Sequence, residues 1–169
     1  MCSDRYPIQC IIPPHILDAM LQSGDARVRD SALSTLKLSS YIRGRRSVLG
    51  SVSAGLPTGS HAGLSRKIID CHGDESDPPS GDIVRTEGGP PSGDPAADQA
   101  YDGLGDTYKF YSEILDRDSI DGQGMPLIGY VHYGEKFNNA FWDGAEMVFG
   151  DGDGIIFQGF TRSLDVIGH

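Results

Sequence analysis

Apolar side chains recur every three to four residues near the start of the chain, in two short runs separated by Ser23 and Gly24. This spacing places them on one face of a helix. The two runs are Ile16, Leu17, Met20 and Leu21, then Val28, Ala32, Leu33 and Leu36. Pro13 and Pro14 favour a helix start, and Asp25 is a typical cap for the second run. The pattern predicts a helical hairpin over 14–38, whose single apolar face must pack on another part of the chain.

The spacing of apolar positions changes beyond Arg66. Strands and turns are predicted in 66–73, 83–86, 126–134, 138–154 and 155–160, with a helix over 95–115 that Asp94 can cap. Ser163 is a fair cap for a further helix within 163–169. Gly, Ser and Pro dominate two other segments, which predicts a protease-sensitive linker at 44–65 and a loop at 72–98. Helices and strands in separate parts of the chain indicate an α+β fold.

Charge is distributed unevenly along the chain. Residues 1–69 carry a formal charge of +5 and residues 70–169 carry −15, within a total of −10. The acidic part disfavours nucleic acid as a partner, because binding phosphates needs clustered positive charge. The two parts either dock on each other by charge or form separate solvated surfaces, and composition leaves both options open.

Two targeting classes are disfavoured by the sequence. A membrane helix would need ~20 consecutive apolar residues, which no stretch approaches. The first residues lack the basic and then apolar segments of a classical secretory signal, so the chain is expected to be cytoplasmic or exported by another route. Three cysteines (Cys2, Cys10 and Cys71) are too few, and odd in number, for a disulfide framework.

Metal signals from the residues alone are weak. Cys71 and His72 form a pair of soft ligands, but two ligands are too few to hold a metal ion. His132 lies in an alternating run and is typical of a packed histidine. The run Asp151-Gly152-Asp153-Gly154 lacks the closing Glu of a calcium loop and favours a tight turn with positive-φ glycines. Residues 118–124 likewise indicate a turn between helix and strand.

Longer motifs are more specific. Residues 132–154 (HYGEKFNNAFWDGAEMVFGDGDG), followed by FTRSLDVIGH at 160–169, resemble the thermolysin family of zinc metallopeptidases. Residues 90–115 and 118–134 fit the same family in the same order. The segment CIIPPHIL at 10–17 resembles the short propeptide of the family's protealysin-like branch. The resemblance implies a helical-hairpin propeptide at 1–50, a linker at 51–65, and at 66–169 the truncated, β-rich N-terminal half of a peptidase domain.

The resemblance also implies metal ligands. His169 corresponds to the first histidine of the family's His-Glu-x-x-His zinc motif, and the sequence stops there, before the general base and the other ligands. Asp165 corresponds to a carboxylate of a calcium site whose partners would lie in the missing half. Zinc is therefore the expected cofactor of the family but is not expected to be held by this chain alone, and calcium is a further option.

Other roles implied by the resemblance concern peptide binding. Asn139 and Ala140 fall where the family's edge strand binds the substrate backbone, and Trp142 lies on the same strand as core or wall. Pro13, Pro14 and Leu17 match the propeptide motif, in a segment suited to lie across a cleft. Cys10 precedes this motif and is either a cap for an active-site zinc or an inert small apolar residue.

Two functions remain open. The first is a zinc-dependent metalloendopeptidase precursor, secreted by family analogy, with a peptide or protein substrate, its own propeptide docked on the catalytic domain, and a C-terminal half needed for activity. The second is a non-catalytic regulatory or binding module derived from such a peptidase. Without the other half we expect exposed apolar surface at Ile128, Val131, Phe141, Met147, Val148, Phe149, Ile155, Ile156 and Phe157.

Overall fold

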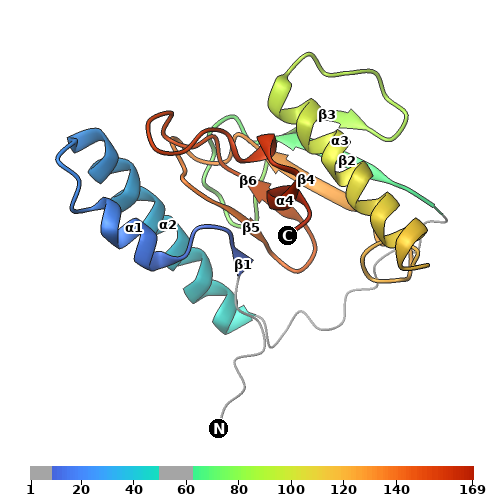
Figure 1. The fold of residues 1–169 in the computed structure, drawn as a ribbon, viewed down its shortest axis with the longest axis horizontal. Coiled ribbons are helices and arrows are strands. Elements are labelled where there is room, and N and C mark those ends of the chain that lie inside the picture. The colour runs from blue at the N-terminus through green and yellow to red at the C-terminus, as the bar shows by residue number, and fades with distance from the viewer. Residues whose placement is uncertain (1–8, 50–62) are drawn as a thin grey trace, which may run out of the picture.

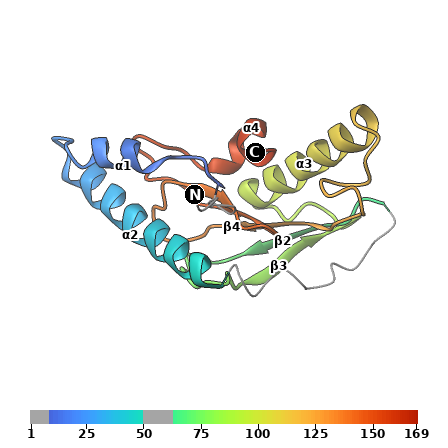
Figure 2. The same ribbon diagram turned by 90° about the horizontal axis from the view of Figure 1, so that it is seen from below.

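A computed structural model of the chain describes residues 9–49 and 63–169. Two N-terminal helices, α1 (Pro14–Met20) and α2 (Ala26–Leu49), lie at one side of a sheet, and α3 (Pro95–Lys109) crosses its other side. Figure 2 shows α3 and the short α4 (Leu164–Ile167) together over one face of the sheet. The predicted α+β organisation and the N-terminal helical hairpin are confirmed.

The sheet of the described residues has six strands in the order β1-β5-β6-β4-β2-β3. They are β1 (Gln9–Cys10), β2 (Arg66–Asp70), β3 (Asp82–Thr86), β4 (Leu127–Val131), β5 (Ala140–Trp142) and β6 (Met147–Phe149). β4 pairs in parallel with both β2 and β6, and the other neighbours are antiparallel. The sheet is therefore mixed, and its edge strand β1 comes from the N-terminal segment, which the sequence pattern did not predict as a strand.

Apolar residues alternate between the two faces of the sheet. Ile68, Val131, Met147 and Phe149 pack with α3 in one cluster. Their chain neighbours, together with Phe141 from β5, form a second cluster with Ile42 and Leu38 of α2 on the other face; these neighbours are Ile69, Tyr130 and Val148. Because successive side chains of a strand point to opposite faces, one sheet supplies both clusters.

This two-sided cover corrects the expected exposure of the β region. Val131, Phe141, Met147, Val148 and Phe149 are all buried within the chain, because α3 shields one face and α2 the other. Ile155 and Ile156 are exposed, as expected. The chain thus closes most of the core that the sequence had assigned to a missing partner.

Two element boundaries also differ from the expectation. α2 continues through Leu49, so residues 44–49 are helical and not linker. Ile42, just before this stretch, packs on the sheet and anchors the helix there. The expected linker at 51–65 lies mostly outside the described residues. Residues 155–160 are not a strand, because the backbone N–H groups of Ile155, Ile156 and Phe157 all donate to the Asp153 carboxylate and hold the segment in a turn.

Helix α3 begins and ends close to the limits predicted for it. The Asp94 carboxylate accepts the Ala97 N–H at 2.8 Å and caps α3, as expected. The helix continues as a π-helical turn at Phe110–Ile114. Gly103 allows Ile167 of α4 to approach closely, since a methyl group there would overlap the isoleucine side chain. No helix of the described residues is long and apolar enough to cross a membrane.

Candidate functional site

The side-chain amide of Asn139 binds the backbone of the N-terminal segment. Its Oδ1 accepts the Ile12 N–H at 2.9 Å, and its Nδ2 donates to the Ile12 carbonyl at 3.0 Å. The same Oδ1 accepts the N–H of Ala140 at 2.9 Å, which holds the amide in this orientation. Asn139 is fully buried, and its partner Ile12 is half-buried. The amide thus satisfies both polar groups of one residue of an extended segment.

The residues before Ile12 continue this pairing as a strand. The Ile11 N–H donates to the Ala140 carbonyl at 3.0 Å. Gln9 and Cys10 then pair antiparallel with Trp142 and Phe141 of β5. The three residues assigned to substrate binding, Asn139, Ala140 and Trp142, therefore lie side by side along one edge, and β1 occupies that edge. Strand β1 is only two residues long, which is too short to leave a periodic signal in the sequence.

The Pro-Pro motif turns this strand into a helix. Pro13 is extended, with ψ 155°, and Pro14 is the first residue of α1, where its missing N–H costs nothing. One helical turn later, Leu17 is only 1% exposed and packs with Met20, Val28 and Ala32. The expected motif residues therefore join the bound strand to the hairpin and anchor it in a small core.

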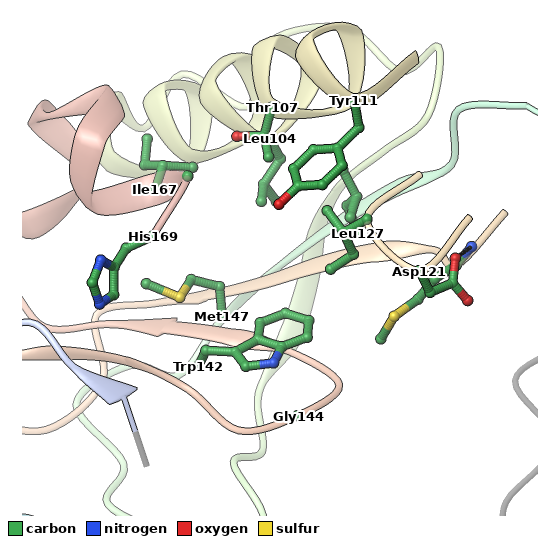
Figure 3. A pocket seen from close by; sticks show the side chains of 13 residues that line it. Leu104, Thr107, Tyr111, Asp121, Leu127, Trp142, Gly144, Met147, Ile167 and His169 are labelled. Atoms are coloured by element: carbon green, nitrogen blue, oxygen red, sulfur yellow. Dashed lines mark hydrogen bonds between the residues drawn. The ribbon is translucent and has the colours of Figure 1, made fainter. Parts of the chain in front are cut away.

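His169 lies beside this edge, at the end of α4. It is exposed and lines a cavity of about 390 Å³ together with Trp142, Met147 and Ile167. Figure 3 shows the imidazole near Met147 and Trp142, on the face of the sheet that α3 covers. Asp165 is exposed and accepts a hydrogen bond from the Ser163 hydroxyl, which lowers the pKa of that carboxyl.

The described residues do not assemble a zinc site. No three side chains of the ligating types (His, Cys, Asp and Glu) come together within the described ranges 9–49 and 63–169. His169 is thus a single candidate ligand, and a catalytic zinc needs three protein ligands. The metal and substrate roles assigned to His169, Asp165, Asn139, Ala140 and Trp142 remain predictions.

Cys71 and Cys10, the candidate metal ligands among the cysteines, each pack in the cluster of buried residues on the α2 face of the sheet. Cys71 is buried, and burial raises the pKa of its thiol to about 12, so it stays protonated. Its neighbour His72 is exposed and instead approaches Asp82 and Asp70, at 3.1 and 3.3 Å. Cys10 packs with the aromatic cluster around Phe141, on the opposite face from Met147. Its Sγ also lies 3.9 Å from a guanidinium nitrogen of Arg43, and both interpretations of Cys10, a zinc cap and a small apolar residue, remain predictions.

His132 differs from the packed strand histidine that its sequence suggested. It lies just beyond β4 with a positive φ of 54°. Its Nδ1 is 2.8 Å from the Asp151 carboxylate, and its Nε2 is 3.2 Å from that of Asp94. The hydrogen bond with Asp151, opposed by partial burial, raises the pKa of His132 to about 9. The ring therefore carries a positive charge at neutral pH and joins three loops, an arrangement with no local sequence signal.

The Asp-Gly run after β6 forms the expected tight turn. Gly152 and Gly154 have φ of 72° and 71°. Burial opposes ionisation of Asp153, but the N–H groups of residues 155–157 and the amide of Asn138 outweigh it and lower its pKa to about 2. The turn expected at 118–124 is also present, with the Asp121 carboxylate accepting two backbone N–H groups.

The sequence of this chain is similar to those of known metallopeptidases. The family model described as thermolysin metallopeptidase, catalytic domain, matches residues 71–169, more than half of the chain. The chain is 42% identical over 163 residues to an extracellular metalloprotease of Pectobacterium carotovorum subsp. carotovorum, covering 96% of this chain and 46% of that protein. It is 41% identical over 165 residues to protease PrtS of Photorhabdus sp., covering 94% and 43%.

A solved structure extends the likeness to the N-terminal segment. The precursor of protealysin, a metalloproteinase from Serratia proteamaculans, superposes with a TM-score of 0.78 at 40% identity, covering 95% of this chain and 44% of that one. This chain thus spans a little under half the length of the relatives that it matches along nearly all of its own length. The matches in sequence and structure show that it belongs to the thermolysin (M4) family of metallopeptidases.

Proposed function

We propose that this chain is the N-terminal part of a zinc-dependent metalloendopeptidase precursor, in which residues 9–49 act as an inhibitory propeptide. The observation that supports the proposal is the occupation of the Asn139 edge by Ile11 and Ile12. A strand edge with an added amide pair binds any extended backbone, whichever side chains it carries. A substrate peptide would meet the same Asn139 and Ala140 groups, so the bound segment and a substrate exclude each other.

The proposed chemistry needs zinc, which would polarise water for attack on a peptide bond. In this proposal His169 is one ligand, Asp165 contributes to a calcium site, and Trp142 forms a wall of the cleft. Pro13, Pro14 and Leu17 fix the direction in which the propeptide leaves the edge. One relative carries the name extracellular metalloprotease, and we propose that the complete protein is likewise exported.

The reading frame after the His169 codon tests the proposal first. Continuation as Glu-x-x-His would supply the general base and a second ligand of the zinc motif. The protein encoded by the whole frame should then hydrolyse casein, lose this activity with a zinc chelator and regain it with Zn²⁺. We expect no hydrolysis by the 169-residue chain itself. Chelator-insensitive hydrolysis by either protein would contradict the proposal.

The alternative, a non-catalytic binding module, is favoured by one observation. The chain buries Val131, Phe141, Met147, Val148 and Phe149 without help from another polypeptide. A fragment that closes its own core can persist as an independent domain. An in-frame stop after His169, with a monomeric chain that melts cooperatively and binds no hydrophobic dye, would favour the module over the precursor.

A further inference from the structure

The residue before Asn139 also binds the N-terminal segment, at a different place. The Asn138 backbone N–H donates to the Thr35 hydroxyl at 2.9 Å. Its side-chain Nδ2 is 3.1 Å from the Ser31 hydroxyl. Asn138 and Thr35 are both fully buried, and Ser31 is nearly so. Neighbouring asparagines therefore bind two parts of one segment: Asn139 the strand around Ile12, and Asn138 the middle of α2.

Asp153 completes this second contact. Its Oδ1 accepts the three backbone N–H groups of the following turn, which leaves Oδ2 to face α2. The Ser31 hydroxyl can donate its one proton to that oxygen, at 2.9 Å, or to the Val28 carbonyl of its own helix, at 3.0 Å. Asn138 donates to the same Asp153 oxygen at 3.2 Å. The Asp153 N–H in turn donates to the Asn138 side chain at 2.8 Å. Asn138 and Asp153 hold each other in place and present a prearranged group of polar atoms to the helix.

The helix carries a matching pattern. Ser31 and Thr35 are four residues apart, and both are buried polar residues on the face of α2 that meets the sheet domain. Ser39, one turn further on, is buried as well, but its hydroxyl has no hydrogen-bond partner among the described residues and takes no part in this contact. Residues at this spacing lie on one helix face, so a single approach of α2 brings Ser31 and Thr35 to Asn138 together. Hydroxyls are a costly choice for a buried helix face unless partners await them. The positions of Ser31 and Thr35 therefore indicate specific recognition of the helix by Asn138 and Asp153, beyond general packing.

The two contacts differ in what they can recognise. The Asn139 edge pairs with peptide groups, which every extended peptide offers. The Asn138–Asp153 pair contacts side-chain hydroxyls on a helix, which an extended substrate does not offer. A ligand that makes both contacts gains from linkage, since formation of one raises the effective concentration of the other.

On the basis of the proposed propeptide role, we propose that Asn138 and Asp153 form a second docking site. This site recognises a helix with hydroxyls four residues apart, and it selects the chain's own segment 9–49 over peptide substrates. The segment consequently stays bound after the chain between α2 and β2 has been cut, and a peptide competing only for the Asn139 edge displaces it poorly.

The test uses the whole chain with a site-specific protease recognition sequence inserted after Ser53. After cleavage, release of the N-terminal fragment is followed by gel filtration and by its dissociation rate from the immobilised C-terminal fragment. The test variant is Ser31→Ala combined with Thr35→Val, which removes both hydroxyls at nearly unchanged volume. The matched control is Ser34→Ala combined with Ser40→Ala, on the exposed face of α2.

We expect the test variant to release the fragment about 10–100 times faster than the wild type, because each lost hydrogen bond costs about 1 kcal/mol. The control should match the wild type. A synthetic peptide with the sequence of residues 7–13 should displace the test variant's fragment readily and the wild-type fragment slowly. A Thr35→Ser variant, which keeps the hydroxyl, should behave as the wild type.

Two results would overturn this second site. One is release from the test variant that is no faster than from the wild type and the control. The other is displacement of the wild-type fragment by the 7–13 peptide as readily as that of the test variant's fragment. A cooperative melt of each uncut chain checks folding, and Ser31→Ala alone serves as a milder variant if the double change abolishes it. The measurement reads binding and not hydrolysis. Failure of the zinc-peptidase proposal would appear in the casein assay, and failure of the second docking site would appear here.

Discussion

His132 should make the stability of this chain depend on pH in the alkaline range. The ring lies between the carboxylates of Asp151 and Asp94, and its pKa is raised from 6.5 to about 9. A tenfold change in an acid dissociation constant corresponds to about 1.4 kcal/mol, so this rise in pKa amounts to about 3 kcal/mol. The His132 side chain is 26% exposed and its partners more so, and water screening reduces the expected contribution to about 2 kcal/mol.

The direction follows from the raised pKa. Protonated His132 is stabilised in the folded state, so its contribution is complete below the unfolded pKa of 6.5. It declines as the pH rises through the folded value of about 9 and is absent above it. The free energy of unfolding should therefore fall by about 2 kcal/mol across this window, over and above the effect of other groups.

The variant that isolates this effect is His132→Asn. Asn accepts a positive φ at least as readily as His, so the backbone at 54° is little perturbed. Urea unfolding of both proteins, followed by the fluorescence of Trp142, the single tryptophan, gives the free energy of unfolding at about pH 6 and about pH 9.5. The wild type should lead by about 2 kcal/mol at the lower pH, and the difference should nearly vanish at the higher one. A difference that stays constant with pH, or grows above about pH 9, would refute the charged bridge.

Substitutions at two further positions test the packing of the sheet domain. Gly150→Ala places a methyl group against the backbone carbonyl of Phe137, which cannot move aside, so unfolding should become easier by about 3 kcal/mol; an unchanged urea midpoint would contradict the geometry. Tyr101→Leu removes a ring held between the guanidinium groups of Arg66 and Arg85, each 3.7 Å from its centre, and should cost about 1–3 kcal/mol by thermal melting. Tyr101→Phe, which keeps the stacking but loses the hydroxyl bonds, should cost less.

The elements with long or strongly periodic patterns were determined by the sequence itself. The hairpin over 14–38 and the helix capped by Asp94 each follow from local spacing and a local cap. The family assignment likewise rested on contiguous motifs such as NNAFW. Such signals can be recognised in a single sequence because the residues that produce them are neighbours in the chain.

The occupied edge was decided only by tertiary structure. Ile12 and Asn139 are 127 positions apart, and Ser31 and Asp153 are 122 apart. Whether an asparagine bonds a segment so distant, or a histidine sits between two carboxylates, depends on how the chain folds back on itself. The same holds for the β region, whose apolar residues appeared to lack cover. Burial is a property of the assembled layers, and α2 and α3 reach the two faces of the sheet through contacts that no local pattern records.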